Sequence, residues 1–81
     1  MHIEIITPDT TVFQGEIAKV RVPGKKGSFQ VLNDHAPIIS TLEKGQVIMV
    51  SPSGEEKIYE IDGGVIEVKN NNIILLIETI L

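Results

Sequence analysis

Few side chains in this sequence could carry out acid–base or nucleophilic chemistry. The only histidines are His2 and His35, and their spacing does not fit a metal-binding pair on one strand or one helix. A nucleophilic site would need Asp34 and His35 to act on a hydroxyl such as that of Ser28, but adjacent residues of an extended chain point to opposite sides. We therefore expect His35 to be a hydrogen-bonded loop residue, and we expect no catalytic residue, cofactor site or metal site.

A glycine-rich turn at residues 23–28 is the second candidate for chemistry. Its sequence, Pro-Gly-Lys-Lys-Gly-Ser, lacks the spacing of a nucleotide phosphate-binding loop, and no helix follows to offer its N-terminus to a phosphate. We therefore exclude nucleotide binding at this turn. Lys25 and Lys26 are the only adjacent basic pair in the chain. Two interpretations stay open for them, a solvated turn tip, which the charge pattern favours, and a contact loop.

The composition describes one small acidic domain. The 81 residues are 42% hydrophobic and 22% charged, and they form a single core over residues 1–81, because a second core needs roughly another hundred residues. Seven Lys and Arg residues oppose eleven Asp and Glu residues, which gives a formal charge of −4 and a pI near 5.0. Nucleic-acid binding depends on cations that displace counterions from phosphates. The composition therefore excludes nucleic acid and favours a protein partner.

The sequence also bears on the compartment and on membrane association. It contains no cysteine, and a small domain without disulfides fits the reducing interior of a cell. The first residues lack a basic stretch followed by an apolar one, and no apolar run approaches the ~20 residues that cross a bilayer. We expect any membrane association to depend on a partner.

Val and Ile are frequent and turn-forming residues recur at short intervals, which predicts short antiparallel strands. The apolar parity changes after Gly15, so we expect a bulge there. Gly63 and Gly64 predict a bend or a close backbone approach, and the asparagines at 70–72 predict a turn with left-handed residues. Eight or nine strands predict an all-β fold, a small antiparallel sandwich or flattened barrel. The expected strands cover residues 1–7, 11–22, 28–32, 38–42, 46–51, 57–62, 65–68 and 73 onward.

Two of these strands, at residues 47–50 and 73–77, have no polar residue on either face. A strand of a two-layer sandwich usually has one face in water, so something is expected to cover both faces here. Barrel curvature or a loop is one explanation, and a docking surface is the other. Three aromatic residues are a poor supply of anchors for an independent binder, although aliphatic sheet faces dock on larger assemblies.

The order of short motifs along nearly the whole chain resembles the N-terminal domain of the epsilon subunit of rotary ATP synthases, called delta in mitochondria. The two motifs that carry this resemblance best are His35-Ala36-Pro37-Ile38-Ile39 and Gly63-Gly64-Val65-Ile66-Glu67-Val68. The others are Ile5-Ile6-Thr7-Pro8, Val12-Phe13-Gln14-Gly15-Glu16, Val20-Arg21-Val22-Pro23-Gly24, Gly27-Ser28-Phe29-Gln30-Val31-Leu32 and Lys44-Gly45.

This resemblance implies a sandwich of about ten strands at the foot of the central stalk of a proton-translocating ATP synthase. It implies a non-catalytic rotor subunit that binds the gamma subunit along one side and the polar loops of the c-ring at one end. Its work would be to couple gamma to the ring, so that ion flow drives ATP synthesis. The implied location is peripheral, on the cytoplasmic face of a bacterial plasma membrane or the equivalent organellar face.

The resemblance assigns two sets of contact residues. Those expected to contact the c-ring are Lys25, Lys26, Gly27 and Ser28. Those expected near gamma, and at the same end of the domain, are Asn33, Asp34 and His35. Many family members have an acidic residue or an amide in place of Ser28, a glycine in place of Gln30, and Pro-Gly in place of Asn33-Asp34. We therefore expect a lysine of the first set to supply the polar contact with the ring.

In most family members a helical hairpin follows the sandwich and restrains ATP hydrolysis, and in some it binds ATP. This chain stops at Leu81, which fits either a trimmed chain or a natural short form. In both cases we expect neither inhibition by hairpin insertion nor ATP binding. A sheet face that the hairpin can cover would then be exposed, so we also expect weak self-association.

Two other classes of protein compete with this interpretation. The alternative is a small-ligand or carbohydrate-binding β-sandwich, but such sites usually rely on exposed aromatic side chains, and the chain has no Trp and only Tyr59. A small hydrolase is the least favoured, because it needs a pocket that joins His35 to a carboxylate.

Overall fold

A computed structural model describes all residues, 1–81, and contains nine strands and no α-helix. No segment therefore forms a helix of the length and hydropathy needed to cross a bilayer. Most expected strands are confirmed within one or two residues at each end. The strands are β1 (His2–Ile6), β2 (Thr11–Glu16), β3 (Lys19–Val22), β4 (Phe29–Leu32), β5 (Ile38–Leu42), β6 (Gly45–Val50), β7 (Glu56–Ile61), β8 (Gly64–Lys69) and β9 (Asn72–Ile77).

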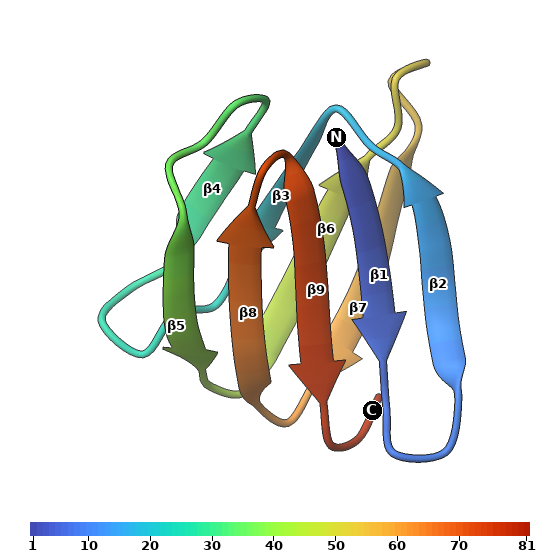
Figure 1. The fold of residues 1–81 in the computed structure, drawn as a ribbon. Helices are drawn as coiled ribbons and strands as arrows, with labels where there is room; N and C mark the ends of the chain where they lie inside the picture. Colours follow the sequence, from blue (N-terminus) through green and yellow to red (C-terminus); the bar gives the residue numbers. More distant parts are fainter.

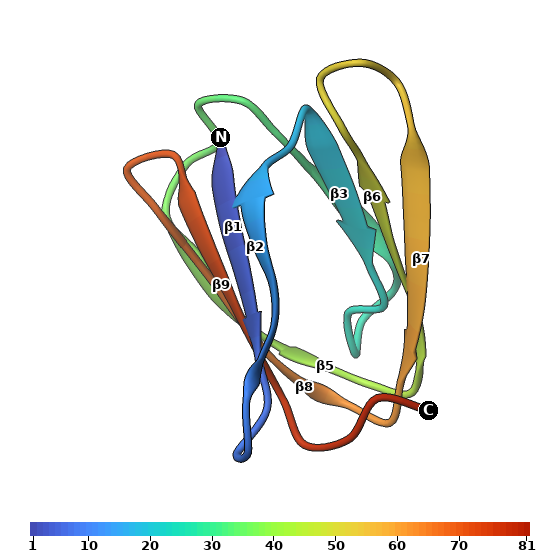
Figure 2. The same ribbon diagram turned by 90° about the vertical axis from the view of Figure 1, so that its right-hand side faces the viewer.

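The strands form two sheets that pack face to face as a β-sandwich (Figures 1 and 2). The five-stranded sheet has the order β2-β1-β9-β8-β5, and the four-stranded sheet has the order β4-β3-β6-β7. Neighbouring strands are antiparallel except β1 and β9, which are parallel. The two sheets do not close into a barrel, so the sandwich form of the prediction is the one confirmed.

Successive strands run in opposite directions, so the loops gather at two ends of the sandwich (Figure 1). We call the lower end of Figure 1 the end that carries residues 7–10, 23–28, 43–44 and 62–63. The upper end carries residues 17–18, 33–37, 51–55 and 70–71. Any loop residue can therefore be assigned to one end.

The core is a layer of aliphatic side chains between the sheets. Alternate residues of each strand point inward, as in β1, where Ile3 and Ile5 are buried while their neighbours are half-buried. Fifteen hydrophobic residues are buried, and no polar or charged residue is. The buried residues are Ile3, Ile5, Ile17, Val20, Val22, Val31, Leu42, Val47, Met49, Ile61, Ile66, Val68, Ile73, Leu75 and Ile77.

The expected strand at residues 11–22 is wrong, and so is the bulge at Gly15. The chain leaves the five-stranded sheet after Glu16 and enters the four-stranded sheet at Lys19, so the change of apolar parity marks a crossing between sheets. Gly15 pairs regularly with Ile3. The register shift in this hairpin lies instead between Ile5 and Ile6, which face Phe13 and Thr11.

The two apolar runs follow ordinary strand alternation. In β9, Ile73, Leu75 and Ile77 are buried, whereas Leu76 points outward and is 52% exposed. In β6, Val47 and Met49 are buried, whereas Ile48 and Val50 are half-buried. Of the outward apolar side chains of β9, Leu76 lies exposed on the face of the sheet, whereas Ile74 is half-buried.

The predicted turn chemistry is confirmed at two places. Asn70 and Asn71 have φ of 50° and 62°, in the left-handed region. Gly64 has φ of 156°, and a Cβ there would overlap the Leu76 carbonyl oxygen and lie 2.9 Å from Ile77 Cδ1. The close backbone approach expected at this glycine therefore lies between β8 and β9.

Candidate interaction surfaces

The loop between β3 and β4 is tightly folded and leaves its lysines in solvent. The Gly27 N–H donates to the Gly24 carbonyl oxygen at 3.0 Å, and Gly27 has φ of 122°. A Cβ on Gly24 would lie 2.7 Å from the Gly27 carbonyl oxygen and 2.8 Å from the Phe29 ring, so only glycine fits this position. Lys25 and Lys26 lie exposed between the two glycines.

This loop also covers part of a sheet edge. The Lys25 N–H donates to the Thr41 carbonyl oxygen at 3.2 Å, and Gly24 forms an isolated antiparallel bridge with Leu42. Strand β5 is the edge of the five-stranded sheet, so these contacts pair the lower half of an otherwise open strand. The loop is therefore held against the sheet.

Ser28 has a partner that was not anticipated from the sequence. Its Oγ accepts a hydrogen bond from Arg21 Nη2 at 3.1 Å, on the exposed surface beside the loop. Because the guanidinium of Arg21 already contacts this hydroxyl, the Ser28 side chain belongs to a small polar pair rather than standing alone at the loop tip.

The loop between β4 and β5 is held by a side chain from a distant turn. The Asp34 N–H donates to Asn71 Oδ1 at 2.9 Å, and Asn71 Nδ2 donates to Asn33 Oδ1 at 2.9 Å. His35 Nδ1 lies 2.7 Å from the Ala36 carbonyl oxygen, so His35 is the hydrogen-bonded loop residue that was expected. The role of Asn71 was missed, because its place in an Asn-Asn-Asn turn predicts a local conformation and no distant partner.

The two sets of candidate contact residues lie at opposite ends of the sandwich. The loop that carries Lys25 to Ser28 precedes β4 and lies at the lower end, whereas Asn33 to His35 follow β4 and lie at the upper end (Figure 1). The expectation that both sets share one end is therefore wrong. The four residues of β4 form an extended strand between them, so the loop before it and the loop after it lie at opposite ends of the sandwich.

The outer face of the five-stranded sheet carries uncovered aliphatic side chains. Leu76 on β9 lies in register with Ile6 on β1 and with Val65 on β8, so these three side chains form a row across the sheet. Val65 is 36% exposed, and Ile39 on the edge strand β5 is 74% exposed. Uncovered aliphatic residues gathered on one face are typical of interaction surfaces.

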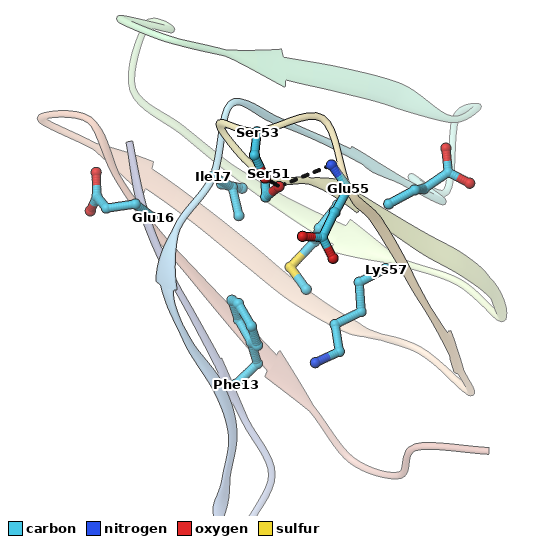
Figure 3. Close-up of a pocket in the computed structure, with 9 residues that line it drawn as sticks. Phe13, Glu16, Ile17, Ser51, Ser53, Glu55 and Lys57 are labelled. Carbon is cyan, nitrogen blue, oxygen red and sulfur yellow. Dashed lines mark hydrogen bonds between the residues drawn. The ribbon is translucent and has the colours of Figure 1, made fainter.

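A hollow on the side of the sandwich, between β2 and β7, was not anticipated (Figure 3). The buried Met49 is one of the residues that line it, and Phe13 and Lys57 extend into it from β2 and β7. Lys57 Nζ lies 5.1 Å from the centre of the Phe13 ring and 5.9 Å from that of Tyr59. Both rings therefore already contact a cation of the chain itself, which does not favour the carbohydrate-binding alternative.

The described side chains do not assemble a metal centre or a hydrolytic site. No group of three or more His, Cys, Asp or Glu side chains lies close enough to hold a metal ion. The ring nitrogen of His35 faces a backbone carbonyl, and that of His2 lies 3.3 Å from Glu16 Oε2 at the surface. The exposed aliphatic side chains on the outer face of one sheet instead favour a β-sandwich interaction domain.

Comparison with known proteins identifies the family. The family described as ATP synthase, Delta/Epsilon chain, beta-sandwich domain matches residues 1–81. The ATP synthase epsilon chain of Chlorobaculum tepidum is 41% identical over 78 residues, which are 96% of this chain and 89% of that protein. The epsilon chain of Dichelobacter nodosus is 36% identical over 75 residues, 93% of this chain. The chain belongs to the family of ATP synthase delta/epsilon chains and represents its β-sandwich domain.

The relatives differ in length, and solved structures share the fold. The chain spans 52% of the Dichelobacter protein, or about half of it. A chain of the Euglena gracilis mitochondrial ATP synthase matches 98% of this chain with a TM-score of 0.92 and 18% identity. A chain of the Tetrahymena thermophila mitochondrial ATP synthase, from its central stalk and c-ring, matches with a TM-score of 0.85 and 15% identity. At these identities the two structures establish the β-sandwich fold.

Proposed function

We propose that this chain is a non-catalytic rotor subunit of an ATP synthase, which fastens the gamma subunit to the c-ring. The observation that carries the proposal is the family match over residues 1–81, joined by the 41% identity to an epsilon chain along 96% of the chain. In this role the domain transmits torque between the membrane-embedded ring and the central stalk, so that ion flow drives ATP synthesis.

The fold supports a mechanical role. Fifteen buried hydrophobic residues fill the space between two sheets, and 36 backbone hydrogen bonds lie within the strands. A sandwich packed in this way resists shear between its sheets, because sliding one sheet over the other would open cavities in a closely packed core. Close packing of this kind favours the transmission of force from one end of the domain to the other.

The two ends of the sandwich offer separate contacts for two partners. We assign Lys25, Lys26, Gly27 and Ser28, at the lower end, to the polar loops of the c-ring. We assign Asn33, Asp34 and His35, at the upper end, to the gamma subunit. These two loops lie at opposite ends of β4, so this strand would connect the proposed ring contact with the proposed gamma contact. The domain would then be peripheral, held at the cytoplasmic face of a bacterial plasma membrane, or its organellar equivalent, through these partners.

Recovery of native partners tests the proposal. The chain, carrying an affinity tag, is expressed in its source organism, and membranes are solubilised in mild detergent before capture and mass spectrometry. We expect the gamma and c subunits to be recovered together with the catalytic head. Capture of a lone soluble enzyme, or of a sugar-containing ligand without gamma and c, would overturn the rotor assignment.

A further inference from the structure

The outer face of the four-stranded sheet carries charges of opposite sign on two different strands. Lys19 and Arg21 point outward from β3, where the residues that alternate with them are buried. Glu56 and Glu60 point outward from β7. All four side chains are exposed, and no ion pair of the chain involves them. The face therefore has a basic strand and an acidic strand, and neither is neutralised by an ion pair within the chain.

Strand β6 lies between the basic and the acidic strand and presents aliphatic side chains outward (Figure 2). Ile48 lies in register with Arg21 of β3 and with Ile58 of β7. Ile58 is 48% exposed, and Ile48 and its outward neighbour Val50 are half-buried. The centre of the face is therefore apolar, with cations on one side of it and carboxylates on the other.

The opposite charges of this face lie too far apart to neutralise one another directly. Lys19 and Glu56 are both in register with Val50, on the two sides of it. Neighbouring strands lie about 4.8 Å apart, so the backbones of β3 and β7 are about 10 Å apart. Arg21 donates from Nη2 to Ser28 Oγ at 3.1 Å, which is a contact with a neutral group. The charges are therefore left for a partner.

The order of basic, aliphatic and acidic strands is self-complementary. A twofold axis that runs along β6 in the plane of contact would place β3 of one copy over β7 of the other, and β7 over β3. Lys19 would then face Glu56 of the second copy. Arg21 would lie about 7 Å along the strand from Glu60 of the second copy, within reach of its long side chain. Ile48 would pack on Ile48 at the axis, and each charge contact would occur twice.

We propose that the outer face of the four-stranded sheet binds a second copy of this chain and forms a twofold dimer. Charge complementarity carries the inference, because a basic and an acidic strand on one face are matched by a face with the reversed order, which the twofold operation supplies. The inference goes beyond the proposed rotor function and does not depend on it. This face is also distinct from the aliphatic row on the outer face of the five-stranded sheet.

The size of the face predicts a weak dimer. Strands β6 and β7 have six residues each. Three strands of about this length, at about 3.3 Å per residue and about 4.8 Å between strands, cover roughly 300 Å² on each copy. A stable interface buries about 800 Å² on each partner. We therefore expect association only at high protein concentration, and we expect it to weaken as ionic strength rises from about 0.05 to about 0.5 M, because salt screens the charges.

Charge exchange between two variants tests the dimer. All chains carry Leu76→Gln, which weakens association through the five-stranded sheet, and this single variant is the parent. Lys19→Glu/Arg21→Glu makes the face acidic, and Glu56→Lys/Glu60→Lys makes it basic. In sedimentation equilibrium we expect each charge variant alone to associate about tenfold more weakly than the parent, and an equimolar mixture of the two to regain association.

A control variant separates the face from net charge. Lys44→Glu/Lys69→Glu makes the same change in net charge as Lys19→Glu/Arg21→Glu, but in a loop and on the other sheet. It should associate as the parent does. Cooperative urea unfolding establishes that each variant is folded, and Lys19→Gln/Arg21→Gln, which removes the charges without reversing them, gives a second and milder test.

Three results would overturn the proposal. One is a parent that stays monomeric at high concentration and low salt. Another is a control variant that loses as much association as the variants of the face, since net charge alone would then explain the loss. The third is a mixture of acidic and basic variants that associates no more strongly than either variant alone.

Discussion

Among single residues, Gly64 is the one whose replacement the backbone tolerates least. Its φ of 156° is rarely adopted by side chains with a Cβ, and a Cβ would also overlap the Leu76 carbonyl oxygen. We predict that Gly64→Ala lowers the free energy of unfolding by about 3 kcal/mol, measured by urea denaturation. Gly54→Ala is the matched control, because Gly54 has φ of 93° but open space around it.

The control variant should cost about 1 kcal/mol, since it has the conformational penalty without the overlap. Equal losses of stability in the two variants would show that the approach of β8 to β9 at Gly64 is not a steric constraint.

Asn71 is the residue that fixes the candidate gamma-contact loop. It accepts a hydrogen bond from the Asp34 N–H and donates one to Asn33, and its own φ is 62°. We predict that Asn71→Gly, which keeps the left-handed conformation, lowers the free energy of unfolding by about 1–2 kcal/mol through loss of these two hydrogen bonds. Native-state hydrogen exchange should show faster exchange of the Asp34 amide.

The conservative change Asn71→Asp separates the two hydrogen bonds, because a carboxylate still accepts from the Asp34 N–H but cannot donate to Asn33. Slow exchange at Asp34 should survive in this variant. Fast exchange in both variants would mean that the Asn71 side-chain oxygen does not hold the loop.

Among the strands, β7 is an edge strand, and we expect Lys57 to protect it from pairing with another chain. Lys57 shares the inward parity of Tyr59 and Ile61, and its ammonium lies over the Phe13 ring of β2. An inward-pointing charge on an edge strand discourages pairing with another chain. We predict that Lys57→Val increases self-association in sedimentation velocity, whereas Lys57→Arg, which keeps a cation over the ring, behaves as the wild type. A Lys57→Val variant no more associated than wild type would contradict this role.

Most strands could be predicted from the sequence, because alternating apolar residues between turn formers depend on local pattern alone. The two strands at residues 11–22 could not be separated, since a bulge and a crossing between sheets both reverse the parity of buried residues. The candidate contact loops could be predicted only in part. The sequence shows Lys25 and Lys26 as a basic pair. It does not show that the backbone beside Lys44 contacts the loop of Lys25 and Lys26, or that Asn71 accepts a hydrogen bond from the Asp34 N–H, because both contacts join loops that are distant in the sequence.

For the whole molecule, the row formed by the half-buried Ile6 and the exposed Val65 and Leu76 bears on self-association. We predict that the chain alone associates weakly at high concentration through this face, because contact would remove apolar area from water. Leu76→Gln should shift the equilibrium toward monomer in sedimentation equilibrium. A wild-type chain that stays strictly monomeric at high concentration would contradict the prediction.

The proposed ring and gamma contacts lie at two ends of the molecule, an arrangement that fits the connecting role proposed above. The resemblance alone grouped both loops at one end, and the direction of β4 separates them. A connector needs stiffness between its contacts, and the polar loops at both ends project from a core of fifteen buried hydrophobic residues. Damage to the core and damage to a loop should therefore have different effects, on stability in the first case and on partner binding in the second.

Site-specific cross-linking in the assembled ATP synthase tests the central claim most directly. A photoreactive amino acid is placed at Lys26 of the lower end in one variant and at Asp34 of the upper end in another, and the cross-linked partners are identified by mass spectrometry. The account predicts a product with the c subunit from position 26 and a product with gamma from position 34. Absence of both products from an assembled complex, or the reverse pattern of partners, would contradict it.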